Sequence, residues 1–523
     1  MTKKAPSRPS AGAPARVTAH TAAARDPYFR IALIGVAFVT LMRLLWLAGR
    51  PIDLYPDEAQ YWIWAQHLDW GYYSKPPVVA WMIAAATALF GDTDLAVKAG
   101  APLTYIATSL IVFAIAARLY GRRVATWCAI AFVTLPGVSL SALIISTDVP
   151  LLFFWAVATY GFIRAREEQA GIGWWLLIGV ACGLGTLSKY FMAFWPAAAL
   201  LYLLLWRDER VHLQRFGLAV LAAVIVYSPN ILWNWAHDFA SYRHTGSNAD
   251  LHGFELHPLS MLDFFGSQFG VFGPVFLAVL IWITVQALRG RLDRKIGLLL
   301  ILSAPFVAGF SGFALLSRSQ PNWAAAAYVS ATVLVVGWLY ERGREAWVQW
   351  SVVLHVIIAI LALGARDISH AANYALPGQD DPLHRVRGWA TLGRSVSNLR
   401  NEHAELPVLG DDRELMAELI YYMQPHPFDM QIWNPAEHIR NGFEMDQSLP
   451  DKPGGDYLWI TNRTDPTEIT DRFDTHTQLA HVIVPLGPGL AREVWVYELR
   501  GFKGYPHARA PADETSAPPA KVE

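Results

Sequence analysis

Residues 53–62 read "DLYPDEAQYW" and place three carboxylates, Asp53, Asp57 and Glu58, among aromatic side chains. They follow a strongly apolar run at about 31–49, which has the length of a membrane-spanning helix. Because this run lacks a convincing cleavage site, we interpret it as a retained helix rather than a removed signal sequence. The side of the membrane on which the three carboxylates lie therefore decides both the fold and the chemistry.

The composition is that of a membrane protein. Of the 523 residues, 54% are hydrophobic and 22 are Trp, and the mean hydropathy is +0.27. The apolar residues fall in blocks of roughly 17 to 25, the length that a helix needs to cross a bilayer core. The two cysteines, Cys128 and Cys182, lie inside such blocks, which favours core residues over a disulfide or a metal pair. We therefore predict a mainly α, polytopic membrane protein whose partners include membrane lipids and no nucleic acid.

Eleven apolar stretches are candidate transmembrane helices. They lie near 31–49, 99–118, 124–143, 149–165, 171–187, 190–206, 215–235, 264–288, 296–315, 323–340 and 347–364. A further stretch, "PPVVAWMIAAATALF" at 76–90, is short for a span and opens with Pro76-Pro77, which suits the start of a helix.

The basic loops decide how this ambiguous stretch is placed. Five short loops rich in Arg and Lys occur at 118–123, 164–166, 207–215, 289–295 and 341–345. If 76–90 does not cross the membrane, all five fall on the same side as the Lys- and Arg-bearing N-terminus, as the positive-inside rule requires. We therefore predict an interfacial or re-entrant helix at 76–90, and residues 50–98 become the first periplasmic loop.

With eleven spans and a cytoplasmic N-terminus, the polar C-terminal part lies in the periplasm. The strand-like runs "DYLWITN", "HVIVPLG" and "EVWVYELRG" and the helical pattern of "DRELMAELIYYM" predict a small α/β domain. The expected organisation is a disordered cytoplasmic N-terminus at 1–26, a transmembrane catalytic domain at 27–364, the periplasmic domain at 365–505 and a disordered tail at 506–523.

The predicted outer face collects chemically active residues from five loops. These are Tyr55, Asp57, Glu58, Tyr73, Lys75, Asp148, Lys189, Tyr190, Asn234, His237, Arg243, His244 and Asn322. Ionisable groups at a membrane boundary are costly to desolvate, so their presence indicates a function. A lipid-linked phosphate substrate fits this set, because Lys and Arg bind phosphate, a carboxylate removes a proton from a hydroxyl, and Trp and Tyr suit sugar faces.

Simpler interpretations exist for several of these residues. Helix capping alone could explain Asp57 and Glu58, which stand at the start of the helix "EAQYWIWAQHL". It could also explain Asp148, at the start of the fourth span. Lys75 could be an interfacial lysine whose charge reaches the headgroups. His237 and His244, seven positions apart, are weak metal candidates by themselves. The agreement of the signals on one face favours a shared site.

Five stretches resemble a known family. They are "YPDEAQYWIWAQHLDWGYYSKPPVVAW", "STDVPLLFFW", "LSKYFMAFW", "PNILWNWAHDFASYRH" and "QPNWAAAAY". Together they are similar to the bacterial branch of the protein-mannosyltransferase-like membrane glycosyltransferases, which includes aminoarabinose and galacturonic acid transferases acting on lipid A or core. The resemblance covers roughly residues 30–345. It implies the GT-C fold and a sugar donor carried on polyprenyl phosphate.

The resemblance also implies roles for individual residues. Asp57 corresponds to the catalytic aspartate of the first loop and is the expected general base, with Glu58 and Asp148 beside it. Lys75, in the "KPP" motif, corresponds to a lysine that contacts the donor phosphate, and Lys189 and Arg243 are the further phosphate-binding candidates. The expected substrate-binding residues are Tyr55, Tyr73, Tyr190, Asn234, His237 and Asn322.

A divalent metal is left open by the resemblance, with His237, His244 and Asp148 as its candidate ligands. The sequence departs from the aminoarabinose transferases at one position. Those enzymes carry a metal-binding Glu just before the Lys-Pro-Pro motif, where this chain has Ser74.

The predicted function is sugar transfer from polyprenyl phosphate to an envelope acceptor, which could be lipid A or core, a glycolipid, a polysaccharide or a protein. Transfer would occur on the periplasmic face of the bacterial inner membrane. The alternative is a transporter or flippase for a lipid-linked glycan. A transporter is expected to place charged or broken segments near mid-membrane in paired halves, whereas here the charges gather at one face.

Overall fold

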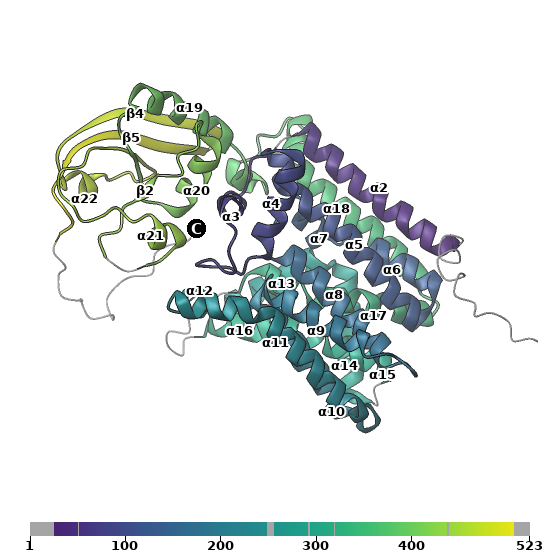
Figure 1. The fold of residues 1–523 in the computed structure, drawn as a ribbon. Coiled ribbons are helices and arrows are strands. Elements are labelled where there is room, and N and C mark those ends of the chain that lie inside the picture. The colour runs from purple at the N-terminus through teal and green to yellow at the C-terminus, as the bar shows by residue number, and fades with distance from the viewer. Residues whose placement is uncertain are drawn as a thin grey trace, which may run out of the picture.

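The computed structural model describes residues 26–50, 52–247, 256–290, 293–317, 319–436 and 439–506. The predicted disordered segments, apart from their innermost residues, lie outside these ranges. The chain forms a bundle of helices joined to a smaller α/β part, with α3 and α4 between them (Figure 1). The helices up to the end of the bundle are α2 (Pro27–Gly49), α3 (Pro56–Gln66), α4 (Val78–Phe90), α5 (Asp94–Tyr120), α6 (Arg122–Thr134), α7 (Pro136–Ser141), α8 (Asp148–Ala165), α9 (Gly173–Thr186), α10 (Phe194–Leu205), α11 (Leu213–Ala236), α12 (Ala240–Ser247), α13 (Pro258–Phe272), α14 (Pro274–Arg289), α15 (Arg294–Ile301), α16 (Ala304–Leu316), α17 (Ala327–Glu341) and α18 (Glu345–Ala371).

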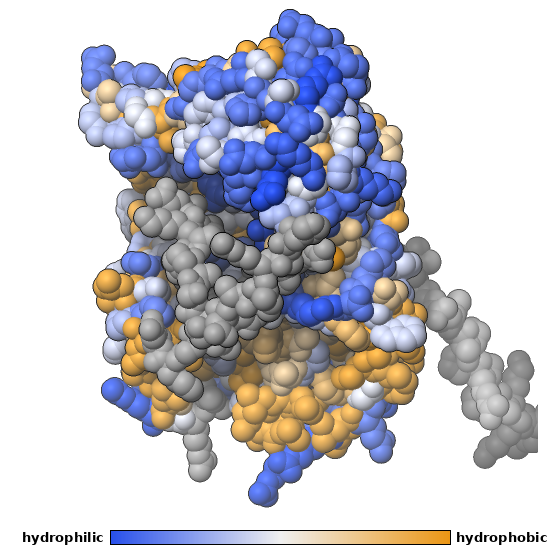
Figure 2. Space-filling view, turned by 90° about the vertical axis from the view of Figure 1, so that its left-hand side faces the viewer, coloured by the Kyte–Doolittle hydropathy of each residue, from blue (hydrophilic) through white to orange (hydrophobic). Residues whose placement is uncertain are grey.

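Within the described residues, five helical stretches are long and apolar enough to cross a membrane, and a bent pair could make a sixth. The five are 27–49, 94–120, 207–236, 294–316 and 345–371, and four shorter apolar helices accompany them. Apolar side chains cover the lower part of the molecule in Figure 2, below a hydrophilic upper part. This arrangement agrees with a membrane protein, while the predicted number of eleven spans stays a prediction.

The structure divides one predicted span. Instead of a single helix at 264–288, α13 and α14 meet at Gly273 with a bend of 114°. Gly273 has a φ of +91°, and Pro274 begins the next helix. Glycine adopts this backbone conformation readily and proline favours the first position of a helix, so the Gly-Pro pair ends one helix and begins another.

The interfacial helix predicted at 76–90 corresponds to α4, which has 13 residues. At about 1.5 Å per residue such a helix is about 20 Å long, too short for a hydrocarbon core of about 30 Å. The length of α4 therefore agrees with a helix that does not cross the membrane.

The five basic loops are joined into a closed ring by ion pairs. The loop at 118–123 contacts the next through Arg118 and Glu167, and the ring continues through four further pairs. These are Arg166–Glu209, Arg294–Asp208, Lys295–Glu341 and Arg123–Glu345, the last of which returns to the first loop. All five loops therefore lie on one face of the bundle, as the topology prediction requires.

The C-terminal part contains a five-stranded sheet with helices packed against it. The strand order is β2-β1-β3-β5-β4, in which β1 is parallel to β2 and β3 and the pairs β3·β5 and β4·β5 are antiparallel. Three strands match the predicted runs, whereas the short β1 and β2 were not predicted. The elements are α19 (Trp389–Glu402), β1 (Val408–Gly410), α20 (Arg413–Tyr422), β2 (Gln431–Ile432), α21 (Gly442–Asp446), β3 (Tyr457–Thr461), α22 (Thr467–Thr470), β4 (Phe473–Gly487) and β5 (Leu490–Phe502).

The sheet is oriented toward the first loop of the bundle. Helix α20, which follows β1, packs against α3, and both α20 and α21 lie beside α3 in Figure 1. The Tyr422 hydroxyl on α20 accepts a hydrogen bond of 2.7 Å from the Leu54 backbone N–H. The C-terminal part therefore covers the stretch that carries Asp57.

Candidate active site

Asp57 lies in the first turn of α3, where a residue of the distant C-terminal part reaches it. Arg413 donates a hydrogen bond of 3.0 Å from Nη1 to Asp57 Oδ1 and one of 2.7 Å to Gln60 Oε1. Burial opposes the charge on Arg413, but the Asp57 and Glu414 carboxylates outweigh it and raise the Arg413 pKa above its usual value. The Asp57 side chain keeps 38% of its surface exposed, so it remains open to a substrate.

Glu58 occupies a different environment from its neighbour. Its carboxylate is fully buried, pairs with the buried Lys98, and accepts hydrogen bonds from the backbone N–H groups of Tyr55 (2.9 Å) and Ile145 (2.7 Å). The bond to Tyr55 closes the capping box of α3. This geometry favours the capping role, and it ties the loop of Asp57 to the loop that precedes Asp148.

Asp148 begins α8 and is held from two sides. Its Oδ1 lies 2.7 Å from Lys189 Nζ, and its Oδ2 accepts a hydrogen bond of 2.7 Å from Asn322 Nδ2. Residues from three of the predicted outer loops therefore meet at this carboxylate.

Lys75 completes the charged centre. Burial lowers its pKa below the ordinary lysine value, and the fields of Asp57, Lys189, Asp148 and Arg413 all reach it. Among the residues that the structure describes, Lys189 and Arg413 each pair with a carboxylate, whereas Lys75 has no ion pair. Lys75 is therefore the cation that is available to an incoming anion.

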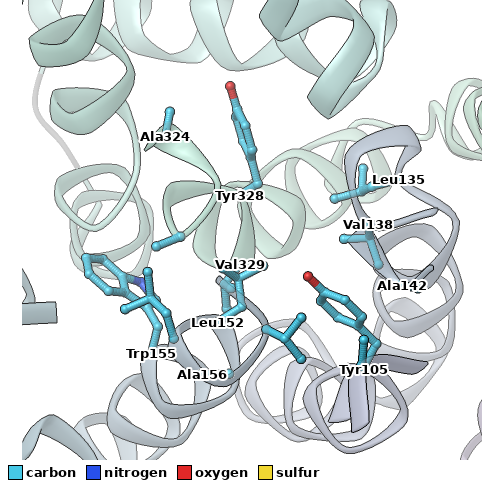
Figure 3. Close-up of a cluster of buried hydrophobic side chains, with 14 of the residues drawn as sticks. Tyr105, Leu135, Val138, Ala142, Leu152, Trp155, Ala156, Ala324, Tyr328 and Val329 are labelled. Carbon is cyan, nitrogen blue, oxygen red and sulfur yellow. The ribbon is translucent and has the colours of Figure 1, made fainter. Parts of the chain in front are cut away.

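Two cavities with apolar walls adjoin this centre. The first, of about 380 Å³, has Lys75 and Lys189 at its polar end; its other walls include Phe191, Phe194, Phe310 and Trp323. The second, of about 280 Å³, has Asp148 and Asn322 among its lining residues. Figure 3 shows part of its wall, formed by Tyr105, Leu135, Val138, Leu152 and Tyr328. Because each partner of the Asp148–Lys189 pair lines a different cavity, the pair stands between them.

Arg243 and the two candidate histidines line a third cavity, of about 530 Å³, together with Tyr73. Arg243 donates a hydrogen bond to the backbone carbonyl of Asp238. Burial, together with the charges of Lys75 and Arg413, lowers the pKa of His244 to about 4. The structure thus brings Lys75 and Lys189 together, while Arg243 lies in a neighbouring cavity.

The other predicted substrate-binding residues are dispersed. Tyr190 lines the first cavity beside Lys189, and the ring of Tyr55 lies 4.7 Å below the Arg385 guanidinium. Asn234 is fully buried and donates to the backbone carbonyl of Asn230. Their roles in substrate binding stay predictions.

The three candidate metal ligands do not come together. Asp148 is engaged by Lys189 and Asn322, whereas His237 lines a different cavity and has its Nδ1 2.8 Å from the Trp233 carbonyl. Within the ranges that the structure describes, no three His, Cys, Asp or Glu residues form a cluster suited to a metal ion. No chemical step is assigned to a metal here.

Sequence reasoning missed Arg413. It lies in "GDDRELMAELIYYM", whose helical pattern was recognised, but the charged residues before that helix gave no indication of a contact with the first loop. A signal was present, since "VLG" is a short apolar run followed by acidic residues, as at the carboxyl end of a parallel strand.

Comparisons with known proteins show the family of this chain. Residues 74–233 match the family described as dolichyl-phosphate-mannose-protein mannosyltransferase. Lipid A galacturonosyltransferase RgtD of Rhizobium johnstonii is 32% identical over 434 residues, which cover 83% of this chain and 91% of that protein. The chain belongs to the GT-C type of bacterial glycosyltransferases. It is thus an enzyme, a glycosyltransferase.

Other relatives of this glycosyltransferase match a shorter part. The undecaprenyl phosphate-alpha-4-amino-4-deoxy-L-arabinose arabinosyl transferase of Erwinia tasmaniensis is 30% identical over 224 residues, 39% of this chain and 40% of that protein. The crystal structure of ArnT from Cupriavidus metallidurans bound to undecaprenyl phosphate is similar in fold, with a TM-score of 0.64 at 16% identity. That likeness covers 89% of this chain and 97% of the crystallised one.

Proposed function

We propose that this glycosyltransferase moves a sugar from polyprenyl phosphate to a hydroxyl of an envelope acceptor, on the periplasmic face of the inner membrane, with Asp57 as general base. The observation that carries the proposal is Lys75, a cation without an ion pair among the described residues, beside Asp57 and at the polar end of an apolar cavity. A lipid-linked phosphate has the matching chemistry, an anion joined to a hydrocarbon chain.

The donor occupies the first cavity in this proposal. Its isoprenoid chain lies against Phe191, Phe194 and Phe310, and its phosphate contacts Lys75. Lys189 is already held by Asp148 and adds a second, weaker attraction. The ArnT crystal structure supports a polyprenyl-phosphate site in a protein of this fold, because it was obtained with undecaprenyl phosphate bound.

The reaction balances without a further reactant. The acceptor oxygen attacks the anomeric carbon of the donor sugar, and the bond between that carbon and the phosphate oxygen breaks. Polyprenyl phosphate leaves with the bonding electrons, and Asp57 takes the proton of the attacking hydroxyl. Asp148, fixed by Lys189 and Asn322 at the second cavity, is placed to orient the acceptor.

The ring of ion pairs at the five basic loops supports the proposed orientation. Basic loops remain cytoplasmic, so the opposite face, which carries Asp57 and the C-terminal sheet, is periplasmic. We propose eleven spans, because this number places the five basic loops on the cytoplasmic side and residues 50–98 and 365–505 on the periplasmic side.

The direct test is mass spectrometry of lipid A, core sugars and other envelope glycans from cells with and without the gene. The proposal predicts loss of one sugar from one glycan, accompanied by accumulation of the polyprenyl-phosphate sugar. Loss of the same sugar with the lipid-linked sugar accumulating only in the cytoplasmic leaflet would instead support transport, and unchanged glycans would contradict both functions.

A further inference from the structure

Arg413 lies at an edge of the C-terminal sheet where ligands commonly bind. Strand β1 runs parallel to both of its neighbours, β2 and β3, and ends at Gly410. Parallel strands bind ligands outside their carboxyl ends. Arg413 follows this end directly and extends from the first turn of α20 to Asp57.

The contacts of Arg413 join it to two carboxylates and bring a second guanidinium group close to it. Its Nη2 lies 3.3 Å from Glu414 Oε1, and Arg385 Nη2 lies 3.4 Å from the same oxygen. Two guanidinium groups thus share one carboxylate, and Arg413 additionally contacts Asp57. A carboxylate entering here could bind Arg413 by replacing its contact with Asp57, while the contact between Arg413 and Glu414 stays in place.

The donor phosphate does not need this cation. A sugar phosphodiester carries one negative charge, and Lys75 is the cation without an ion pair at the apolar cavity, among the residues described. Lys75 comes from the membrane side of the site and Arg413 from the C-terminal part. A sugar whose phosphate contacts Lys75 would therefore extend past Asp57 toward Arg413.

We propose that Arg413 binds the carboxylate of a uronic acid carried by the donor. The planar guanidinium matches a carboxylate with two parallel hydrogen bonds, which a lysine cannot reproduce. When the sugar carboxylate takes this position, Nη1 leaves Asp57 Oδ1 and the Asp57 carboxylate becomes free to act as base. This inference rests on the proposed sugar transfer and names the class of sugar.

The comparisons support the choice of an anionic sugar. The match with the galacturonosyltransferase spans 434 of the 523 residues. Wherever a stretch of that length begins, it includes residues 90–434, and Arg413 lies within this range. The match with the Erwinia aminoarabinose transferase covers only 39% of the chain. The sequence match that extends into the C-terminal sheet is therefore to a protein named for transferring a uronic acid, whereas the likeness to the ArnT crystal structure, at 16% identity, is one of fold alone.

The test compares two donors that differ only in the carboxylate. Purified enzyme receives polyprenyl phosphate carrying either galacturonic acid or galactose, and donor Kd and transfer to lipid A are measured. Wild-type enzyme should prefer the uronosyl donor. Arg413→Gln should weaken uronosyl binding by about 10- to 100-fold, as for loss of a charge-assisted hydrogen bond, with little change for galactose. Arg413→Lys should recover only part of this preference.

The exposed Arg394 of α19 provides the control, because Arg394→Gln should leave both donors unaffected. Equal losses for both donors, or no change for either, would overturn the role of Arg413, since a phosphate contact or simple misfolding affects them alike. Wild-type enzyme that transfers both sugars equally would refute this inference and leave the proposed function intact. Wild-type enzyme that binds neither donor would refute the proposed function itself.

Discussion

Arg413 Nη1 lies 3.0 Å from Asp57 Oδ1, although 356 positions of the chain separate the two residues. One belongs to the first loop after α2 and the other follows the first strand of the C-terminal sheet. The candidate site is therefore shared by the bundle and the C-terminal part, and neither builds it alone.

Replacing Asp57 by Asn should lower the rate of sugar transfer by about 10²- to 10⁴-fold, the usual loss of a general base. Asn keeps an oxygen that can accept from Arg413, so the thermal midpoint in detergent should stay close to that of the wild type. Purified Asp57→Asn enzyme with near-normal turnover would return this residue to helix capping.

Donor binding should weaken as the pH rises, and the weakening should begin at a pH below the ordinary pKa of lysine. Burial lowers the pKa of Lys75 in the substrate-free enzyme, whereas a donor phosphate favours the charged ammonium. Binding then requires proton uptake above the lowered pKa, so the donor KM increases through that range. A Lys75→Arg variant keeps its charge and should show a flat KM profile between about pH 7 and 10. Identical profiles for the two enzymes would exclude Lys75 as the titrating contact.

Glu58→Gln should destabilise the protein strongly, because it leaves Lys98 charged and buried without its partner, a change that costs about 3–5 kcal/mol. The double variant Glu58→Gln/Lys98→Met removes both charges and should recover most of the thermal midpoint. We also expect it to recover transfer, which would assign Glu58 to positioning. A stable double variant without transfer would support a catalytic Glu58.

Impermeant thiol reagents test the orientation in intact spheroplasts. Cysteines introduced at the exposed Leu68 and Glu405 should react, whereas one at Arg344, in a basic loop, should react only after lysis. The natural Cys128 and Cys182 are buried and should give little background. Labelling of Arg344→Cys before lysis would invert the proposed topology.

The sequence predicted most of the residues that the structure brings together around Asp148 and Lys75, because they lie in short motifs beside apolar runs. Asp148 and Asn322 were placed on one face by span parity, and they share a hydrogen bond. Arg413 could not be found this way, because its contact depends on how a whole sheet docks on α3. Hydropathy did not predict the bend at Gly273, because it measures how apolar a segment is and not the direction of its backbone. The Gly273-Pro274 pair is the sequence feature that indicates this bend.

Arg243 shows a different limit. It lies within one helical turn of His244 on α12, and its grouping with Lys75 assumed that neighbouring loops share one cavity. In the structure Arg243 and Lys75 line neighbouring cavities rather than the same one. Loop proximity can be inferred from topology, but the partition of space between loops depends on side-chain packing.

The closed ring of ion pairs among the basic loops also determines where the bundle can open. The exposed pairs are individually weak and the Arg166–Glu209 pair is largely buried, and together the five pairs connect the helix ends in a circle. The ring therefore resists separation of the helices at the end that carries the basic loops. If the bundle opens to admit a long-chain lipid, it should open away from the ring, on the side that is periplasmic in the proposed orientation.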